Sequence, residues 1–236
     1  MLFTLRISIP DQPGTLGAVA SAFGNGGANI LTLDVVERED GFAVDDLYVE
    51  APAGMQKALQ SAIEAVPGLA VEDVRPAEAF RDMLASMELA AVLAETAGAD
   101  AVGKLVENLP DALWANWSVA LIGGPDKPEV LASSIGAPSM ADITTPWLPL
   151  EAPRRLATSH WAPPGLPVET RDQWGQAEMQ LVAAPLYNSN SAVLVGRRSG
   201  PRFRNAELRQ LGQLSRIAAA VSSSKAPTPL NSIGKN

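Results

Sequence analysis

Hydrophobic and polar residues alternate at the start of the chain and then change period. Residues 3 to 9 place apolar side chains at every second position, which is typical of a strand with one buried face. After the break at residues 10 to 14, apolar positions from Leu16 to Phe23 recur every three or four residues, as in an amphipathic helix. The chain therefore begins with a strand followed by a helix.

The same two periods predict the remaining elements of the first 76 residues. We expect strands at 29–36 and 42–50 joined by the polar tip 37–41, a helix at about 55–66, and a last strand from 69 to about 74. The predicted order is βαββαβ. With right-handed crossovers this order forms a four-stranded antiparallel sheet with two helices on one face, the ferredoxin-like arrangement.

The rest of the chain predicts a second α+β domain. We expect helices over 77–112, strands at 117–122 and 130–135, a short helix at 146–156, a strand at 157–161, a loop at 162–175, a hairpin of 180–186 with 192–195, and a closing helix around 208–221. The predicted domains are 1–76 and 83–222, with a linker at 77–82 and a mobile tail at 223–236.

Two motifs of the first domain resemble a known family. The junction Ile7-Ser8-Ile9-Pro10-Asp11-Gln12-Pro13-Gly14-Thr15-Leu16 and the later Gly27-Ala28-Asn29-Ile30 resemble the signature of ACT domains. The resemblance covers about residues 2–76. It implies an amino-acid ligand near the turn, commonly at the interface of two ACT domains, and hence a homodimer. The ligand-binding residues that we predict from it are Asp11, Gln12, Pro13, Gly14, Thr15, Leu16, Asn29 and Ile30.

The residues of the turn support the same ligand chemistry. The turn leads into a helix N-terminus, where the N–H groups of Gly14, Thr15 and Leu16 lack intrahelical partners and the helix dipole favours an anion. Asp11 can receive an ammonium group, and Asn29 offers both a donor and an acceptor. Together they suit a zwitterion. Each residue also has an ordinary explanation, since Asp11 can cap the helix and Gly14 and Asn29 suit turns.

The second domain resembles the C-terminal part of GAF domains in its last hairpin and closing helix, residues 181–221. With the preceding elements the resemblance spans about 83–222. It implies an α/β/α domain with a central antiparallel sheet and a pocket facing it. Trp147, His160, Trp161 and Trp174 are candidates to line that pocket, and core packing explains them equally well.

Composition and charge remove several classes of protein. The chain has 236 residues, a net charge of −8 and no cysteine, which excludes disulfides and thiolate chemistry. Residues 1–80 carry 4 basic and 12 acidic residues, whereas the remainder is balanced at 14 each. This asymmetry supports a boundary near residue 80 and argues against nucleic-acid binding. Without a membrane-length apolar stretch or a signal-like N-terminus, we expect a cytoplasmic protein that does not bind membranes.

Two charged groups have competing explanations. The acidic residues Glu37, Glu39, Asp40, Asp45 and Asp46 suggest a cation site, but a solvated hairpin tip explains the first three better, and we predict no metal. The arginines of the last hairpin suggest phosphate binding, and a solvated hairpin exit explains them better. They are Arg197, Arg198, Arg202 and Arg204.

No enzyme motif is found in the sequence, and we expect a protein without catalytic residues or a cofactor. His160 is the only histidine, and Ser159 beside it would point elsewhere in a strand. The leading hypothesis is a regulatory sensor that binds an amino acid and signals through an unidentified protein partner. The alternatives are an interaction protein that binds no metabolite, and an enzyme that uses the GAF-like pocket.

Overall fold

The structure is a computed structural model, and it describes residues 1–77, 85–139, 145–156, 179–198 and 200–223. The chain divides into two compact units. Unit 1 comprises Met1–Met83 together with Gly200–Ala206, and unit 2 comprises Leu84–Ser199 together with Glu207–Asn236. Because a short segment far along the sequence belongs to unit 1, the two units are not two uninterrupted stretches of chain.

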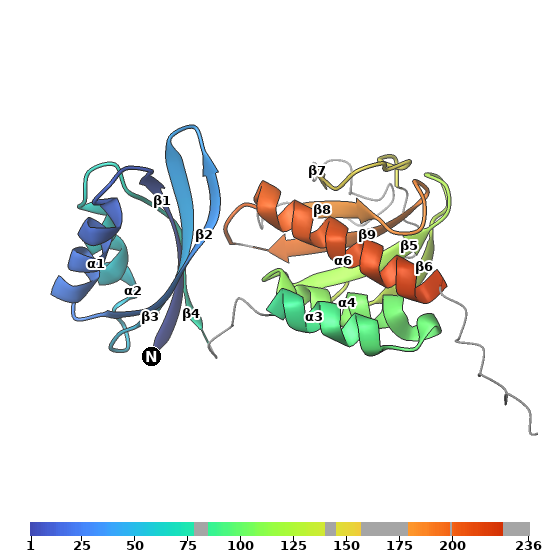
Figure 1. The fold of residues 1–236 in the computed structure, drawn as a ribbon, viewed down its shortest axis with the longest axis horizontal. Helices are drawn as coiled ribbons and strands as arrows, with labels where there is room; N and C mark the ends of the chain where they lie inside the picture. Colours follow the sequence, from blue (N-terminus) through green and yellow to red (C-terminus); the bar gives the residue numbers. More distant parts are fainter. Residues whose placement is uncertain (78–84, 140–144, 157–178, 199, 224–236) are drawn as a thin grey trace, which may run out of the picture. The chain divides into compact units, whose positions relative to one another are not determined.

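Unit 1 contains strands and helices in the order predicted from the sequence. They are β1 (Leu2–Pro10), α1 (Thr15–Asn25), β2 (Asn29–Glu39), β3 (Phe42–Glu50), α2 (Gln56–Glu64) and β4 (Ala70–Ala77). The sheet is antiparallel with the order β2-β3-β1-β4, so β2 and β4 are its edges. Helices α1 and α2 lie on the same face of this sheet (Figure 1).

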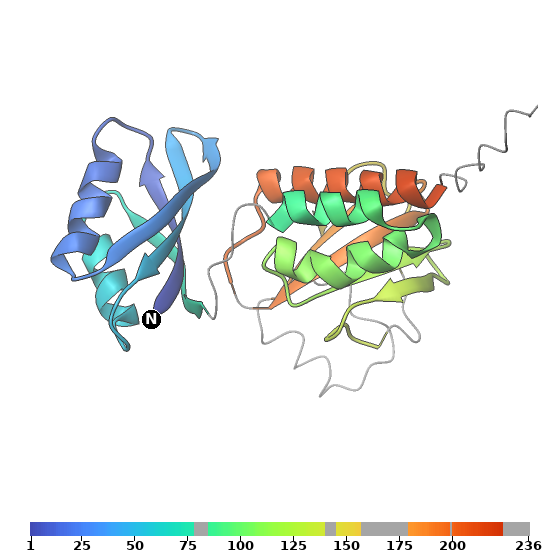
Figure 2. The same cartoon turned by 60° about the horizontal axis from the view of Figure 1, so that its bottom comes forward.

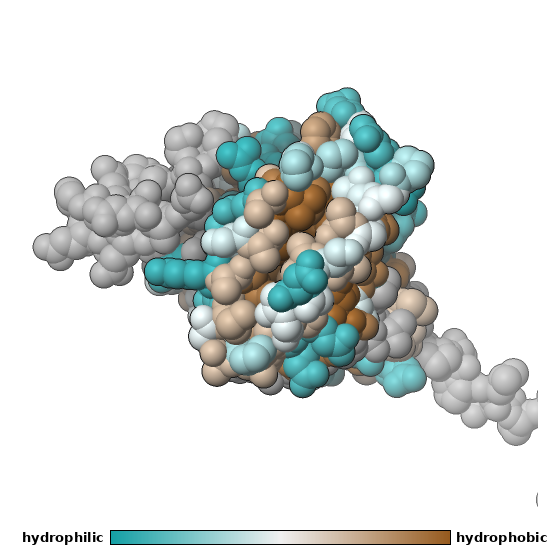
Figure 3. All heavy atoms as spheres, turned by 90° about the vertical axis from the view of Figure 1, so that its left-hand side faces the viewer, coloured by the Kyte–Doolittle hydropathy of each residue, from teal (hydrophilic) through white to brown (hydrophobic). Residues whose placement is uncertain are grey.

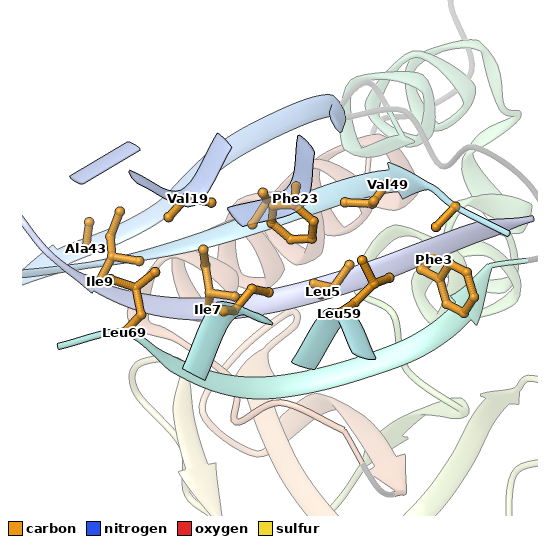
Figure 4. Packing of buried hydrophobic residues seen from close by; sticks show 13 residues of the cluster. Phe3, Leu5, Ile7, Ile9, Val19, Phe23, Ala43, Val49, Leu59 and Leu69 are labelled. Carbon is orange, nitrogen blue, oxygen red and sulfur yellow. The ribbon is translucent and has the colours of Figure 1, made fainter. Parts of the chain in front are cut away.

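The core of unit 1 lies between the sheet and the two helices. The alternating apolar residues of β1 point toward the helices, where Val19, Phe23 and Leu59 are also buried (Figure 4). Burying one such side chain contributes about 1.5–3 kcal/mol. The alternation in β1 therefore identifies the helix-covered face correctly.

The opposite face of β1 is also buried, although the sequence predicted only one buried face. Thr4 is 6% exposed and Arg6 is 3% exposed. The guanidinium of Arg6 donates to both carboxylate oxygens of Asp46, at 2.6 and 2.7 Å, and to the Arg202 carbonyl at 3.2 Å. Arg202 belongs to the segment Gly200–Ala206 of unit 1, so the second buried face depends on residues that are distant in sequence.

Unit 2 is built on a five-stranded sheet with helices on one face. Its elements are α3 (Ala85–Glu95), a 3-10 turn (Gly98–Asp100), α4 (Ala101–Ala112), β5 (Trp117–Ile122), β6 (Glu129–Ser133), β7 (Arg154–Leu156), β8 (Met179–Pro185), β9 (Ser191–Arg198) and α6 (Asn205–Ser223), whose first two residues fall in unit 1. The antiparallel strand order is β6-β5-β9-β8-β7. Helices α3, α4 and α6 lie side by side along the sheet (Figure 2).

The predicted helix at 146–156 is wrong. Residues 145–153 form turns and irregular structure, and Arg154–Leu156 forms the short strand β7 beside β8. Pro146, Pro149 and Pro153 lack the N–H groups that a helix needs, and the apolar residues between them are buried against the sheet instead. The strand predicted at 130–135 ends at Ser133, and Ile135 is 99% exposed.

Several predictions fall outside the described residues. They are the strand at 157–161, the loop at 162–175, and the tail beyond residue 223. Among the helices that the structure describes, none combines the length and the hydropathy needed to span a membrane.

Candidate functional site

The turn between β1 and α1 is exposed and brings the chain to a helix N-terminus without a side-chain cap. Its backbone is tied down by two hydrogen bonds, from Asp11 N to the Gly41 carbonyl and from Gln12 N to the Pro10 carbonyl, both at 2.9 Å. Gly14 has φ 93°, a left-handed conformation that favours glycine. Thr15 N donates to the Gln12 carbonyl at 3.3 Å, so this N–H is partly satisfied by the turn that precedes the helix.

Asp11 does not cap α1. Its carboxylate lies 3.9 Å from Nε of Arg38 in β2, and both side chains are largely exposed. A surface pair of this kind contributes little, about 0–1 kcal/mol. The carboxylate is therefore accessible to a ligand, with one cation of the chain beside it.

Asn29 and Ile30 lie at the other end of the sheet from this turn, so one chain does not bring them together with Asp11–Leu16. Asn29 of β2 is aligned with Glu50 of β3, and Glu50 is aligned with Leu2 at the start of β1. The turn follows Pro10 at the opposite end of β1, where Pro10 is aligned with Phe42. Eight steps along β1 correspond to roughly 26 Å. The reason is topological, because α1 carries the chain back along the sheet before β2 begins.

Asn29 instead borders an open hollow at the far end of unit 1. The hollow has a volume of about 430 Å³ and is lined by Met1, Gly27, Ala28, Asn29, Glu50, Ala51 and Pro52. Gly27 has φ 72° and belongs to the turn that leads from α1 to β2. Asn29, for which a turn was the ordinary explanation, is instead the first residue of β2, and ligand binding by Asn29 stays a prediction.

Asp45 entered the sequence analysis only as a member of the acidic group that could suggest a cation site, and its burial was not predicted. It is 1% exposed, and neither carboxylate oxygen has a hydrogen-bond partner. In the sheet, Asp45 is aligned with Ile7 of β1 and Val35 of β2. It lies on the same face of β3 as Ala43 and Val49, which point toward the helices (Figure 4). The signal was present in the sequence, because every second residue from 43 to 49 is apolar except Asp45.

Burial raises the pKa of Asp45 from 3.8 to about 6. The nearby charge of Arg38 lowers this pKa, and the charges of Asp46 and Asp11 raise it. The effect of burial is the largest because no donor compensates the charge. A raised folded-state pKa means that ionising Asp45 destabilises the fold, so stability from this group is lost as the pH rises from 4 through 6.

We expect Asp45→Asn to be more stable than the wild type at pH 8, by on the order of 2 kcal/mol. One pKa unit corresponds to about 1.4 kcal/mol, and the buried amide of the variant still lacks partners. The difference should shrink towards pH 4, where the wild-type carboxyl is neutral. Urea unfolding of both proteins at several pH values measures it, and a difference independent of pH would contradict the assignment.

The other acidic residues of this end have different environments. Glu39 and Asp40 are exposed at the β2–β3 tip, as predicted. Asp46 is paired with Arg6, and Glu37 accepts a hydrogen bond from Asn205 N at 3.1 Å. Within the described ranges, no group of three or more His, Cys, Asp or Glu is placed to hold a metal ion.

In unit 2, Trp147 is 4% exposed and belongs to the core on the face of the sheet formed by β5, β8 and β9. Its indole Nε1 and the hydroxyl of Thr145 are buried without hydrogen-bond partners. The Trp147 carbonyl accepts from Arg154 Nη2 at 2.8 Å, which fixes the segment. The other pocket candidates, His160, Trp161 and Trp174, lie outside the described residues.

The four arginines of the last hairpin are not one solvated group. Arg197 is fully buried, with Nη2 donating at 2.5 Å to both the Leu113 carbonyl and Glu207 Oε1, and Nε donating to the Trp114 carbonyl at 3.1 Å. Arg204 is paired with Glu72. Only Arg198 and Arg202 are exposed. The expectation of a solvated exit is therefore wrong for Arg197 and Arg204, whose charges are used inside the fold.

No family model matches the sequence, and no curated protein matches it. Among solved structures, the GAF domain of an Acinetobacter phosphoenolpyruvate-protein phosphotransferase is 11% identical, with a TM-score of 0.41 over 58% of this chain and 90% of that chain. A GAF domain of A. aeolicus is 10% identical, with a TM-score of 0.41 over 58% and 92%. The photosensory core module of a Stigmatella aurantiaca phytochrome is 12% identical, with a TM-score of 0.44 over 79% and 41%. This chain is thus similar to GAF domains and to a photosensory module.

Proposed function

We propose that this chain is a regulatory small-molecule sensor whose ACT-type domain, residues 1–76, binds an amino acid. The single observation that carries the proposal is the exposed N-terminus of α1, whose N-cap residue is Gly14 and which has no side-chain cap. Such an end binds a carboxylate through backbone N–H groups and the helix dipole. The observed sheet order β2-β3-β1-β4 with two helices on one face supports a ferredoxin-like domain, the fold that the ACT resemblance implies.

A second copy of the chain would bring the two halves of the predicted site together. Strand β2 is an edge, and Leu31 and Val35 on it are 39% and 44% exposed. If two β2 edges pair antiparallel about a two-fold axis that passes at Asp34, the middle of the strand, Asn29 of one copy lies opposite Glu39 of the other. Arg38 is next to that position and next to Asp11. The proposed homodimer therefore places Asn29 beside the turn of the other copy. Within one chain, Asn29 and the turn are at opposite ends of the sheet.

The GAF-like domain, about residues 83–222, is proposed as a second ligand site or as the transmitter of the signal. The buried and unpartnered hydroxyl of Thr145 and indole Nε1 of Trp147 favour a polar ligand against that face of its sheet. Binding at either domain acts by preferring one of two states of the protein, which requires different affinities for those states.

The interaction-protein alternative rests on the surface of α1. This helix contains no charged residue, and its exposed positions are mostly small or apolar, among them Leu16, Ala18 and Ala20. Figure 3, which faces unit 1 from the side of its helices, shows apolar residues gathered there. An uncharged helix surface of this kind suits contact with another protein. The enzyme alternative has no comparable observation among the described residues.

A thermal-shift screen of the twenty amino acids on the full chain tests the sensor proposal. At a ligand concentration 100 times Kd we expect about 2.7 kcal/mol of stabilisation, which corresponds to a rise in Tm on the order of 5 °C. Gly14→Trp should abolish the rise, because its side chain fills the approach to the α1 N-terminus. Asn29→Ala should reduce it.

Gly54→Trp is the matched control, because Gly54 has φ 82° with open space around its Cβ position, as Gly14 has φ 93° with open space. Its ligand response should equal that of the wild type. No stabilisation of the wild type by any amino acid would count against the sensor. Measured turnover of a metabolite would favour the enzyme, and stable co-purification of one protein without any bound ligand would favour the interaction protein.

A further inference from the structure

The strongest unexplained group of unit 1 is the carboxylate of Asp45. A buried carboxylate without a hydrogen bond is costly, and proteins normally pair or neutralise such a group. Both carboxylate oxygens of Asp45 lack hydrogen-bond partners. By contrast, the buried guanidinium of Arg6, on the opposite face of the sheet, is paired with Asp46. A group left in this state is expected to have a partner that the isolated chain does not supply.

The surroundings of Asp45 explain what kind of partner fits. Its neighbours in the sheet are β1 and β2, and α1 covers this face. Helix α1 contains no ionisable side chain, and the only one in β1, Arg6, points to the other face. The charges that act on Asp45 are therefore Arg38, Asp46 and Asp11. Two of the three are negative, and Arg38 lies against Asp11, so the local balance favours a cation from outside.

Asp45 is buried but not far from the surface. Val35, which is aligned with it on the edge strand, is 44% exposed, and Leu16 in the first turn of α1 is 45% exposed. The uncapped N-terminus of α1 belongs to the same end of the unit. This end of unit 1 therefore combines backbone N–H groups that suit an anion with one unpaired carboxylate that suits a cation.

We propose that Asp45 recognises the cationic nitrogen of the ligand, while the start of α1 binds its carboxylate. This inference rests on the proposed amino-acid function and makes it specific: the site reads both charges of the ligand with two separate groups of the chain. The cation is an ammonium or guanidinium group, supplied either by the α-amino group or by a basic side chain. Because the ligand cation binds the ionised carboxylate, the affinity falls below pH 6.

The test compares the wild type with Asp45→Asn by isothermal titration of the full chain, using the amino acid that the screen selects. We expect at least a tenfold loss of affinity in Asp45→Asn, together with a higher Tm of the unliganded variant. A drop in binding caused by misfolding would instead lower that Tm. Asp40→Asn is the control, since it removes the same charge from an exposed position of the β2–β3 tip, and it should bind like the wild type.

Analogues of the selected ligand identify the source of the cation. The α-hydroxy acid lacks the α-ammonium group, and an analogue with a neutral side chain lacks a basic one. The wild type should discriminate against one of them by at least tenfold, and Asp45→Asn should not. If Asp45→Asn binds the amino acid as tightly as the wild type, this inference is wrong and the sensor proposal stands. If the wild type binds no amino acid, both are wrong.

Discussion

Arg197→Met is expected to destabilise the protein by about 3–5 kcal/mol. Arg197 is fully buried and joins three segments of unit 2: β9, the end of α4 through the Leu113 and Trp114 carbonyls, and the start of α6 through Glu207. Methionine fills part of the volume but donates no hydrogen bond. It therefore leaves the Glu207 carboxylate buried with its strongest partner removed.

Arg198→Met is the matched control for this experiment, because Arg198 is the next residue of β9 and its side chain is exposed. We expect a change within about 0.5 kcal/mol. Urea denaturation of both variants measures the free energy of unfolding. The double variant Arg197→Met/Glu207→Leu should be more stable than Arg197→Met alone. Replacing both members of a buried ion pair by apolar residues costs less than removing one member and leaving the other charge buried. Equal stability of the two single variants would show that the ion pair has no role in the fold.

Gly196→Val is expected to destabilise unit 2 by about 3 kcal/mol or more. Gly196 is aligned with Trp117 across the β5–β9 ladder, and the indole ring lies directly over it. A Cβ at this position would meet Trp117 Cε2 at 2.2 Å and Cζ2 at 2.3 Å. Trp117 is 2% exposed in the centre of the core, so its ring cannot move aside without disturbing the residues around it.

Gly103→Ala in α4 is expected to have the opposite effect, because the space around the Cβ position of Gly103 is open. It should stabilise the protein by about 0.5–1 kcal/mol, because alanine favours a helix and reduces the freedom of the unfolded chain.

Tryptophan fluorescence during unfolding follows the Gly196 variant, since Trp117 reports on the same contact. If Gly196→Val unfolded at the wild-type denaturant concentration, the close packing of the indole on the strand would be disproved.

The element order of unit 1 was predictable because each element carries its own pattern. Residues 3 to 9 bury every second side chain toward α1 and α2, and the glycines near residues 14 and 27 stand where the backbone has positive φ. In unit 2 the predicted hairpin near residues 180–195 is β8 and β9. The segment 146–156 was not predictable in this way, since its apolar residues are buried by packing on the sheet and its three prolines exclude a helix.

The candidate site was only partly predictable for the same reason. The turn from Asp11 to Leu16 has the exposed, uncapped helix N-terminus that its sequence indicates. Its relation to Asn29 depends on strand register, and the register separates the two by the length of β1. Asp45 was visible in the sequence as one acid in an apolar row, but its lack of partners could be seen only once its neighbours were placed.

Local elements, the uneven charge and the turn that presents the N-terminus of α1 could all be inferred from the order of residues alone. These properties depend on residues close together in the chain, through side-chain periodicity, proline and glycine geometry, and composition. Three features emerged from the fold: Arg6 and Arg197 are buried, Gly200–Ala206 belongs to unit 1, and Asp45 is enclosed without a partner. Burial and pairing of a charge depend on residues distant in sequence, and no local pattern specifies which distant residues will meet.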